Sequence, residues 1–145
     1  MVKRVLNDVL IGAVLAFGSQ ILQYGAYLIL LLAGFSMPYE SAPSDPGSHP
    51  DWVTQINLMS MVAAVPVLVA AFVAAWILKT RSIGEGVRQG LVWAAVAVLW
   101  QLMIGIANGT TAALAVPGVW VYFAAFAVGP IIAGWLRQRR ARALT

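Results

Sequence analysis

The sequence predicts an all-α integral membrane protein, a bundle of four transmembrane helices with both termini on the cytoplasmic side. Of the 145 residues, 61% are hydrophobic and only 10% are charged, with nine Lys or Arg and five Asp or Glu. Soluble domains carry roughly 25% charged residues, so this composition excludes a water-soluble fold. The apolar residues fall into four long runs, and the basic residues are distributed around these runs in a one-sided pattern.

Each apolar run is long enough to cross a bilayer as a helix. The runs cover residues 9–35, 56–78, 87–107 and 116–136, and charged residues are confined to their ends. A helix rises about 1.5 Å per residue, so about 20 residues span a hydrocarbon core of about 30 Å. We expect one four-helix domain, 1–145, with an outer loop at 36–55, an inner loop at 79–86 and a basic C-terminal tail at 137–145.

The basic residues predict the orientation, because Lys and Arg in short loops are retained on the cytoplasmic side. All nine lie before the first run, around the start of the third, or after the fourth. This pattern predicts a bacterial-type cytoplasmic membrane protein with both termini inside. A cleaved signal peptide is disfavoured, because the first run is nearly twice the roughly 7–15 apolar residues of such signals. Asp8 is expected to pair with Arg4 at the start of the first helix.

The first run carries a polar face. Gln20, Gln23, Tyr24 and Tyr27 recur at i, i+3, i+4 and i+7, which puts them on one side of a helix. The run is centred on residue 22, so both glutamines are expected near the middle of the bilayer, where lipid offers no hydrogen-bond partner. We expect this face to point into the bundle or against a partner protein.

The outer loop and the two middle runs supply candidate partners for this face. The loop holds four prolines and is expected to be irregular, while Pro50-Asp51-Trp52 has the form of a helix start. Asn57 and Ser60 in the second run and Gln101 in the third would complete a neutral polar zone near the outer leaflet. The zone either holds helices together, at roughly 0.6–2 kcal/mol per hydrogen bond, or lines a small outward-opening cavity. The first interpretation is favoured.

The fourth run is rich in small residues. Ala125, Gly129 and Ala133 are spaced by four, a pattern that lets helices approach closely, either within the bundle or against another protein. Pro66 in the second run and Pro130 in the fourth each remove a helical hydrogen bond. Both are candidate hinges, although an ordinary kink is the favoured interpretation.

The tail after the fourth run carries Arg137, Arg139, Arg140 and Arg142. Attraction to anionic lipids at the cytoplasmic face, together with topology, accounts for these four residues. No aromatic side chain is interleaved with them, so no nucleic-acid partner is expected.

No catalytic site, cofactor or metal is expected. The chain has no Cys and one His, and the runs offer no plausible set of acid, base and nucleophile. Proton-coupled antiport is disfavoured, because the first run holds amides where a titratable carboxylate is needed. Glu40, Asp45, His49 and Asp51 could in principle collect a divalent cation, but the prolines between them set no ligand geometry, and an ordinary solvated loop is favoured.

Two functions remain. The favoured one is a small non-catalytic membrane protein that acts as an accessory or structural subunit, packed against partner membrane helices or as a homo-oligomer. The alternative is a small transporter or channel for a neutral or zwitterionic solute or a lipid headgroup, which would use the polar face of the first helix.

Overall fold

The computed structural model describes residues 2–35 and 48–143, and these residues form helices and short connections without any strand. Four long helices follow one another: α1 (Val2–Leu32), α2 (Pro50–Ile77), α3 (Ile83–Asn108) and α4 (Pro117–Ala143). A short 3-10 helix, η2 (Thr111–Ala115), precedes α4. All four α-helices are long and apolar enough to cross a membrane. The predicted all-helical fold with four helices of spanning length is therefore confirmed.

The helices extend beyond the apolar runs at their charged ends. α1 begins at Val2, α3 begins at Ile83 and α4 continues to Ala143. Lys, Arg and Glu are good helix formers, so backbone hydrogen bonding continues past the last apolar residue. The predicted inner loop 79–86 and basic tail 137–145 are therefore partly helical. The end of the predicted outer loop 36–55 is helical too, while its residues 36–47 lie outside the described part of the chain.

Local chemistry sets the helix ends. α2 begins with Pro50, followed by Asp51 in its first turn, as the sequence indicated. α1 ends three residues before the apolar run does, because Gly34 adopts the left-handed conformation with φ 86° and the chain closes on the last turn of the helix. Gly109, with φ 67°, ends α3 in the same conformation. At the start of α3, the Ser82 side chain accepts a hydrogen bond from the backbone N–H of Glu85.

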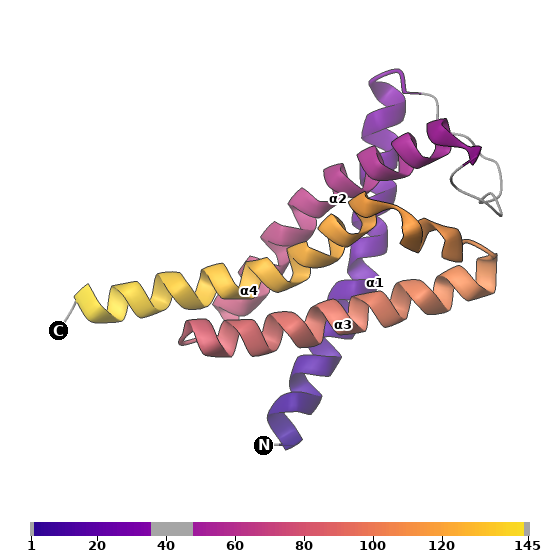
Figure 1. Ribbon diagram of the computed structural model, residues 1–145. Helices are drawn as coiled ribbons and strands as arrows, with labels where there is room; N and C mark the ends of the chain where they lie inside the picture. The colour runs from indigo at the N-terminus through magenta and orange to yellow at the C-terminus, as the bar shows by residue number, and fades with distance from the viewer. Residues whose placement is uncertain (1, 36–47, 144–145) are drawn as a thin grey trace.

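α4 is the central helix of the bundle. It packs along α2 and along α3, whereas α1 crosses the other helices obliquely and contacts α2 and α3 (Figure 1). α2 and α3 are consecutive in the chain but make almost no contact with each other over their described lengths. α4 therefore joins the two helices that precede it.

Small residues let α4 approach α2 closely. A Cβ atom added at Gly129 would lie 2.6 Å from the backbone nitrogen of Phe72 and 2.8 Å from the Cβ of Ala71. Ala125 and Ala133 on α4 are also buried. The sequence predicted that the small-residue face of α4 packs either within the bundle or against another protein. In the structure this face packs within the bundle.

A second close contact joins α3 to α4. Gly86 and Gly90 on α3 are four residues apart, and a Cβ atom at Gly90 would lie 2.5 Å from the carbonyl oxygen of Ala127. A Cβ atom at Gly86 would overlap the carbonyl group of Pro130, which is fully buried at this contact. The sequence analysis missed this glycine pair, although its spacing is the small-xxx-small signal of close helix packing.

The basic end of the bundle is where α1 and α3 begin and where α2 and α4 end. Arg137 on α4 donates a hydrogen bond to the carbonyl oxygen of Trp76 on α2, and its guanidinium lies 4.6 Å from the centre of the Trp76 ring. Arg140 lies over the same ring, and Arg139 lies over Trp135. Part of the predicted lipid-facing tail thus contacts aromatic rings of the protein itself.

Candidate functional site

The candidate site is a cavity of about 260 Å³ at the end of the bundle opposite the basic residues. Every long helix contributes to its wall, together with the connection between α3 and α4. The lining residues are Gln23 from α1, Trp52, Ile56, Met59 and Ser60 from α2, Gln101 from α3, Thr110 and Ala113 from the connection, and Val119 and Tyr122 from α4. We call this the outer cavity.

The polar groups of the outer cavity are all neutral. Gln23, Ser60 and Gln101, three of the residues that the sequence analysis singled out, meet there across three different helices. Thr110, which follows α3, adds a hydroxyl group. Among the described residues the lining contains no charged side chain, so these residues offer amide and hydroxyl hydrogen bonds without a net charge.

Three of these groups are not used by the protein. The Gln23 amide and the hydroxyls of Ser60 and Thr110 make no hydrogen bond to the described residues. Ser60 is only 4% exposed and still lines the cavity. These groups can therefore bind a molecule, or water, inside the cavity.

Other polar residues near the outer cavity hold helices together. The amide of Gln20 on α1 donates to Oε1 of Gln101 on α3 over 3.2 Å. The Tyr122 hydroxyl donates to Oγ of Ser19 over 2.5 Å, and Ser19 in turn donates to the carbonyl oxygen of Ala16. These bonds fix the positions of Gln101 and Tyr122 in the cavity wall.

The sequence analysis missed Ser19 and Tyr122 as parts of this network. The signal for Ser19 was a row of small residues in α1, namely Gly12, Ala16, Ser19 and Ala26, which are all buried in the bundle. Their spacings of three, four and seven residues mark one face of a helix. Tyr122 lies in the second turn of α4 and is 2% exposed.

Tyr24 does not join the inward polar face that the sequence predicted. Its side chain is 71% exposed and points away from the bundle. Tyr27 is half-buried and does not line the outer cavity. Asn57 has a structural role instead, because its Oδ1 accepts a hydrogen bond of 2.6 Å from the backbone N–H of Gly118 in the first turn of α4.

The charged residues differ from expectation in one place. Asp8 forms an ion pair with Arg88 on α3, where Asp8 Oδ2 and Arg88 Nη2 are 3.1 Å apart, and not with Arg4. Among the described residues, no group of three His, Asp or Glu side chains could hold a metal ion. Glu40 and Asp45 of the considered cation site lie outside those residues. The hinge roles of Pro66 and Pro130 remain predictions.

Comparison of the chain with family models, with curated proteins and with solved structures finds no match. The functional proposal therefore depends on the geometry of the site.

Proposed function

We propose that this protein is an integral membrane protein with both termini in the cytoplasm and that its outer cavity binds a small neutral or zwitterionic molecule, either a solute or a lipid headgroup. The observation that carries the proposal is the pairing of a cavity with two polar side chains, Gln23 and Ser60, that have no partner among the described residues. Ligand sites combine an apolar wall with a few polar groups that fix orientation. The outer cavity has both.

The orientation is supported by the gathering of all nine basic residues at one end of the bundle. A reporter fused after Thr145 is expected to be active only on the cytoplasmic side. An extracytoplasmic signal from that reporter would contradict the proposed orientation, and with it the position of the cavity toward the outer leaflet.

Gln23→Leu and Gln20→Leu form a matched pair for testing the cavity. Both replace a glutamine of α1 with a residue of similar size, but only Gln23 lines the cavity, and only Gln20 donates a hydrogen bond to Gln101. Gln23→Leu is expected to remove ligand binding and to leave the unfolding temperature unchanged or slightly raised. Gln20→Leu is expected to lower stability by roughly 0.6–2 kcal/mol and to retain most of the binding.

The assay uses the full chain in liposomes and a panel of glycerol, urea, glycine betaine and glycerophosphocholine. Flux is followed by light scattering after an osmotic step, and binding is followed by the unfolding temperature in detergent. The proposal predicts that at least one compound gives a saturable response that Gln23→Leu abolishes. Two results would contradict the proposal: no response of the wild-type chain to any compound, or equal effects of Gln23→Leu and Gln20→Leu on the response.

A second candidate is the accessory or homo-oligomeric role that the sequence favours. The observation that supports it is Tyr24, whose phenol is exposed on an apolar helix where lipid cannot satisfy it. A partner helix with a polar group at that depth would accept the hydrogen bond. Purification in mild detergent is expected to recover a stoichiometric complex, either with another subunit or with a second copy, that Tyr24→Leu weakens. A wild-type chain that is monomeric and free of partners would exclude this role.

A further inference from the structure

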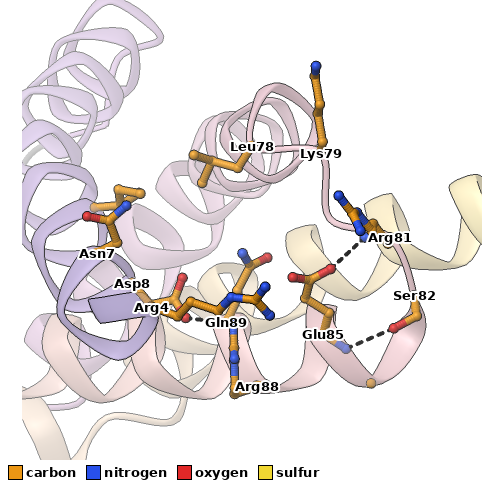
Figure 2. A pocket seen from close by; sticks show the side chains of 12 residues that line it. Arg4, Asn7, Asp8, Leu78, Lys79, Arg81, Ser82, Glu85, Arg88 and Gln89 are labelled. Carbon is orange, nitrogen blue, oxygen red and sulfur yellow. Dashed lines mark hydrogen bonds and ion pairs between the residues drawn. The ribbon is translucent and has the colours of Figure 1, made fainter. Parts of the chain in front are cut away.

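A larger cavity lies at the basic end of the bundle, far from the site proposed above. Its volume is about 660 Å³, within the range of small-molecule sites. It opens between the start of α1, the connection from α2 to α3, and the first turns of α3 (Figure 2). We call it the inner cavity.

The inner cavity carries a net positive charge. Four basic side chains line it, Arg4, Lys79, Arg81 and Arg88, against two carboxylates, Asp8 and Glu85. Two of these six groups form the Asp8–Arg88 ion pair described above, in which the side chain of Asp8 is buried at 6% exposed and that of Arg88 is 40% exposed.

The second carboxylate is also engaged by the protein. Glu85 Oε2 accepts a hydrogen bond of 2.8 Å from the backbone N–H of Arg81, as Figure 2 shows, so it holds the connection to α3 in place. No carboxylate of the described residues forms an ion pair with Arg4, Lys79 or the Arg81 guanidinium. Three cations at the rim are thus left without a protein counter-charge.

The first turn of α3 adds little to this charge, because three of its amides, those of Ile83, Glu85 and Gly86, already donate hydrogen bonds within the protein. Ser82 accepts from Glu85, and the side chain of Gln138 on α4 accepts from Ile83. The attraction for an anion therefore comes mainly from the side chains. The wall also includes two apolar residues, Ile11 and Leu78, and Leu78 is 41% exposed.

We propose that the inner cavity binds the phosphate group of an anionic ligand, through Arg4 and Arg81 with Lys79 at the rim. Guanidinium groups bind phosphate with two parallel hydrogen bonds, and basic pockets between membrane helices on the cytoplasmic side are suited to phosphate headgroups. The same chemistry is presented by an anionic phospholipid and by a free phosphate ester. The apolar wall next to the cations would accommodate the chains of a lipid.

The test compares two double variants of equal net charge. Arg4→Gln with Arg81→Gln removes two cations of the inner cavity and leaves the Asp8–Arg88 pair intact. Arg139→Gln with Arg142→Gln removes two exposed cations near the end of α4, outside the cavity. At physiological salt, charges more than about 8 Å apart in water are largely screened, so the tail variant reports general attraction to anions.

Binding to the full chain in neutral detergent is measured by calorimetry with four probes: short-chain phosphatidylglycerol, short-chain phosphatidylcholine, glycerol 3-phosphate and inorganic phosphate. Saturable phosphatidylglycerol binding is expected, weakened about 30-fold in the cavity variant, as two basic residues near a lipid surface imply, and less than about threefold in the tail variant. Equal weakening in both variants, or no saturable binding of any anionic probe, would overturn the proposal.

The soluble probes separate the two sources of phosphate. Glycerol 3-phosphate or inorganic phosphate that binds saturably and competes with phosphatidylglycerol would support the phosphate site and identify a free anion as a sufficient ligand. Binding of phosphatidylglycerol alone would support the site and assign it to a lipid. If the cavity variant does not fold, Lys79→Gln is the replacement, with an expected weakening of about fivefold. An unchanged affinity in a folded Lys79→Gln chain would then count against the proposal.

Discussion

The close contact between α3 and α4 makes a strong prediction for Gly90→Ala. A methyl group at this position would lie 2.5 Å from the Ala127 carbonyl oxygen and 2.8 Å from the Ala127 Cα, where ordinary van der Waals contacts are 3.4–4 Å. All the nearest atoms belong to the backbone of α4, so no side chain can rotate away to make room. The two helices must therefore separate by about 1 Å along this contact.

The free-energy cost follows from that separation. A gap of about 0.5–1 Å forfeits a quarter to a half of the dispersion attraction between facing atoms, and overpacking typically costs about 1–3 kcal/mol. Replacing a helical glycine with alanine gains up to about 1 kcal/mol where there is room. The same change at Gly18 of α1 meets no atom within 4 Å. We expect Gly90→Ala to be less stable than Gly18→Ala by about 1–3 kcal/mol.

Thermal unfolding in mild detergent, followed by circular dichroism, measures this difference. Gly18→Ala is expected to raise the unfolding temperature or leave it unchanged, and Gly90→Ala to lower it. Unfolding temperatures that move in the same direction by the same amount in both variants would refute the close packing of α3 on α4.

Three further predictions can be checked by the same measurement. Arg88→Gln is expected to lower the free energy of unfolding by about 3 kcal/mol, because it leaves the buried Asp8 carboxylate without its partner. Asp8→Asn is expected to lower it by only about 1 kcal/mol, because water can reach the Arg88 guanidinium that remains. Equal losses in the two variants would contradict the difference in burial. Tyr122→Phe and Ser19→Ala are each expected to lower the free energy of unfolding by about 1–2 kcal/mol. The double variant is expected to lose less than the sum of the two single losses, because the two hydroxyls share one hydrogen bond. Strictly additive losses would argue against that bond. Arg137→Gln is expected to cost about 1 kcal/mol through its lost contacts with the α2 tryptophan, and unchanged stability would exclude a structural role for them.

The number and order of the helices could be predicted from the sequence because hydrophobic length dominates the behaviour of membrane helices. Their ends could not be placed from apolar length alone. Lys3 and Arg4 continue α1 toward the N-terminus, whereas Gly34 ends it inside the apolar run. A glycine close to the end of an apolar run was the available signal, since its left-handed conformation closes a helix.

The candidate site was predicted in part. Gln23 and Tyr24 were assigned to one face, but consecutive residues differ by about 100° around a helix, and only one of them can be near the middle of the buried face. The row from Gly12 to Ala26 shows that Gln23 lies near the centre of that face and Tyr24 about 120° away from it. Small residues, which permit close packing, located the buried face better than polar residues did.

The central position of α4 has a consequence for biosynthesis. α4 is synthesised after α2 and α3, and until then these two helices lack the helix that packs along both of them. Gly86 and Gly90 lack their packing surface during that interval, because the atoms closest to them belong to α4. Assembly of the bundle therefore depends on α4. A chain interrupted before Pro117 would keep the contacts of α1 with α2 and α3, but it would lack the helix that packs along both α2 and α3.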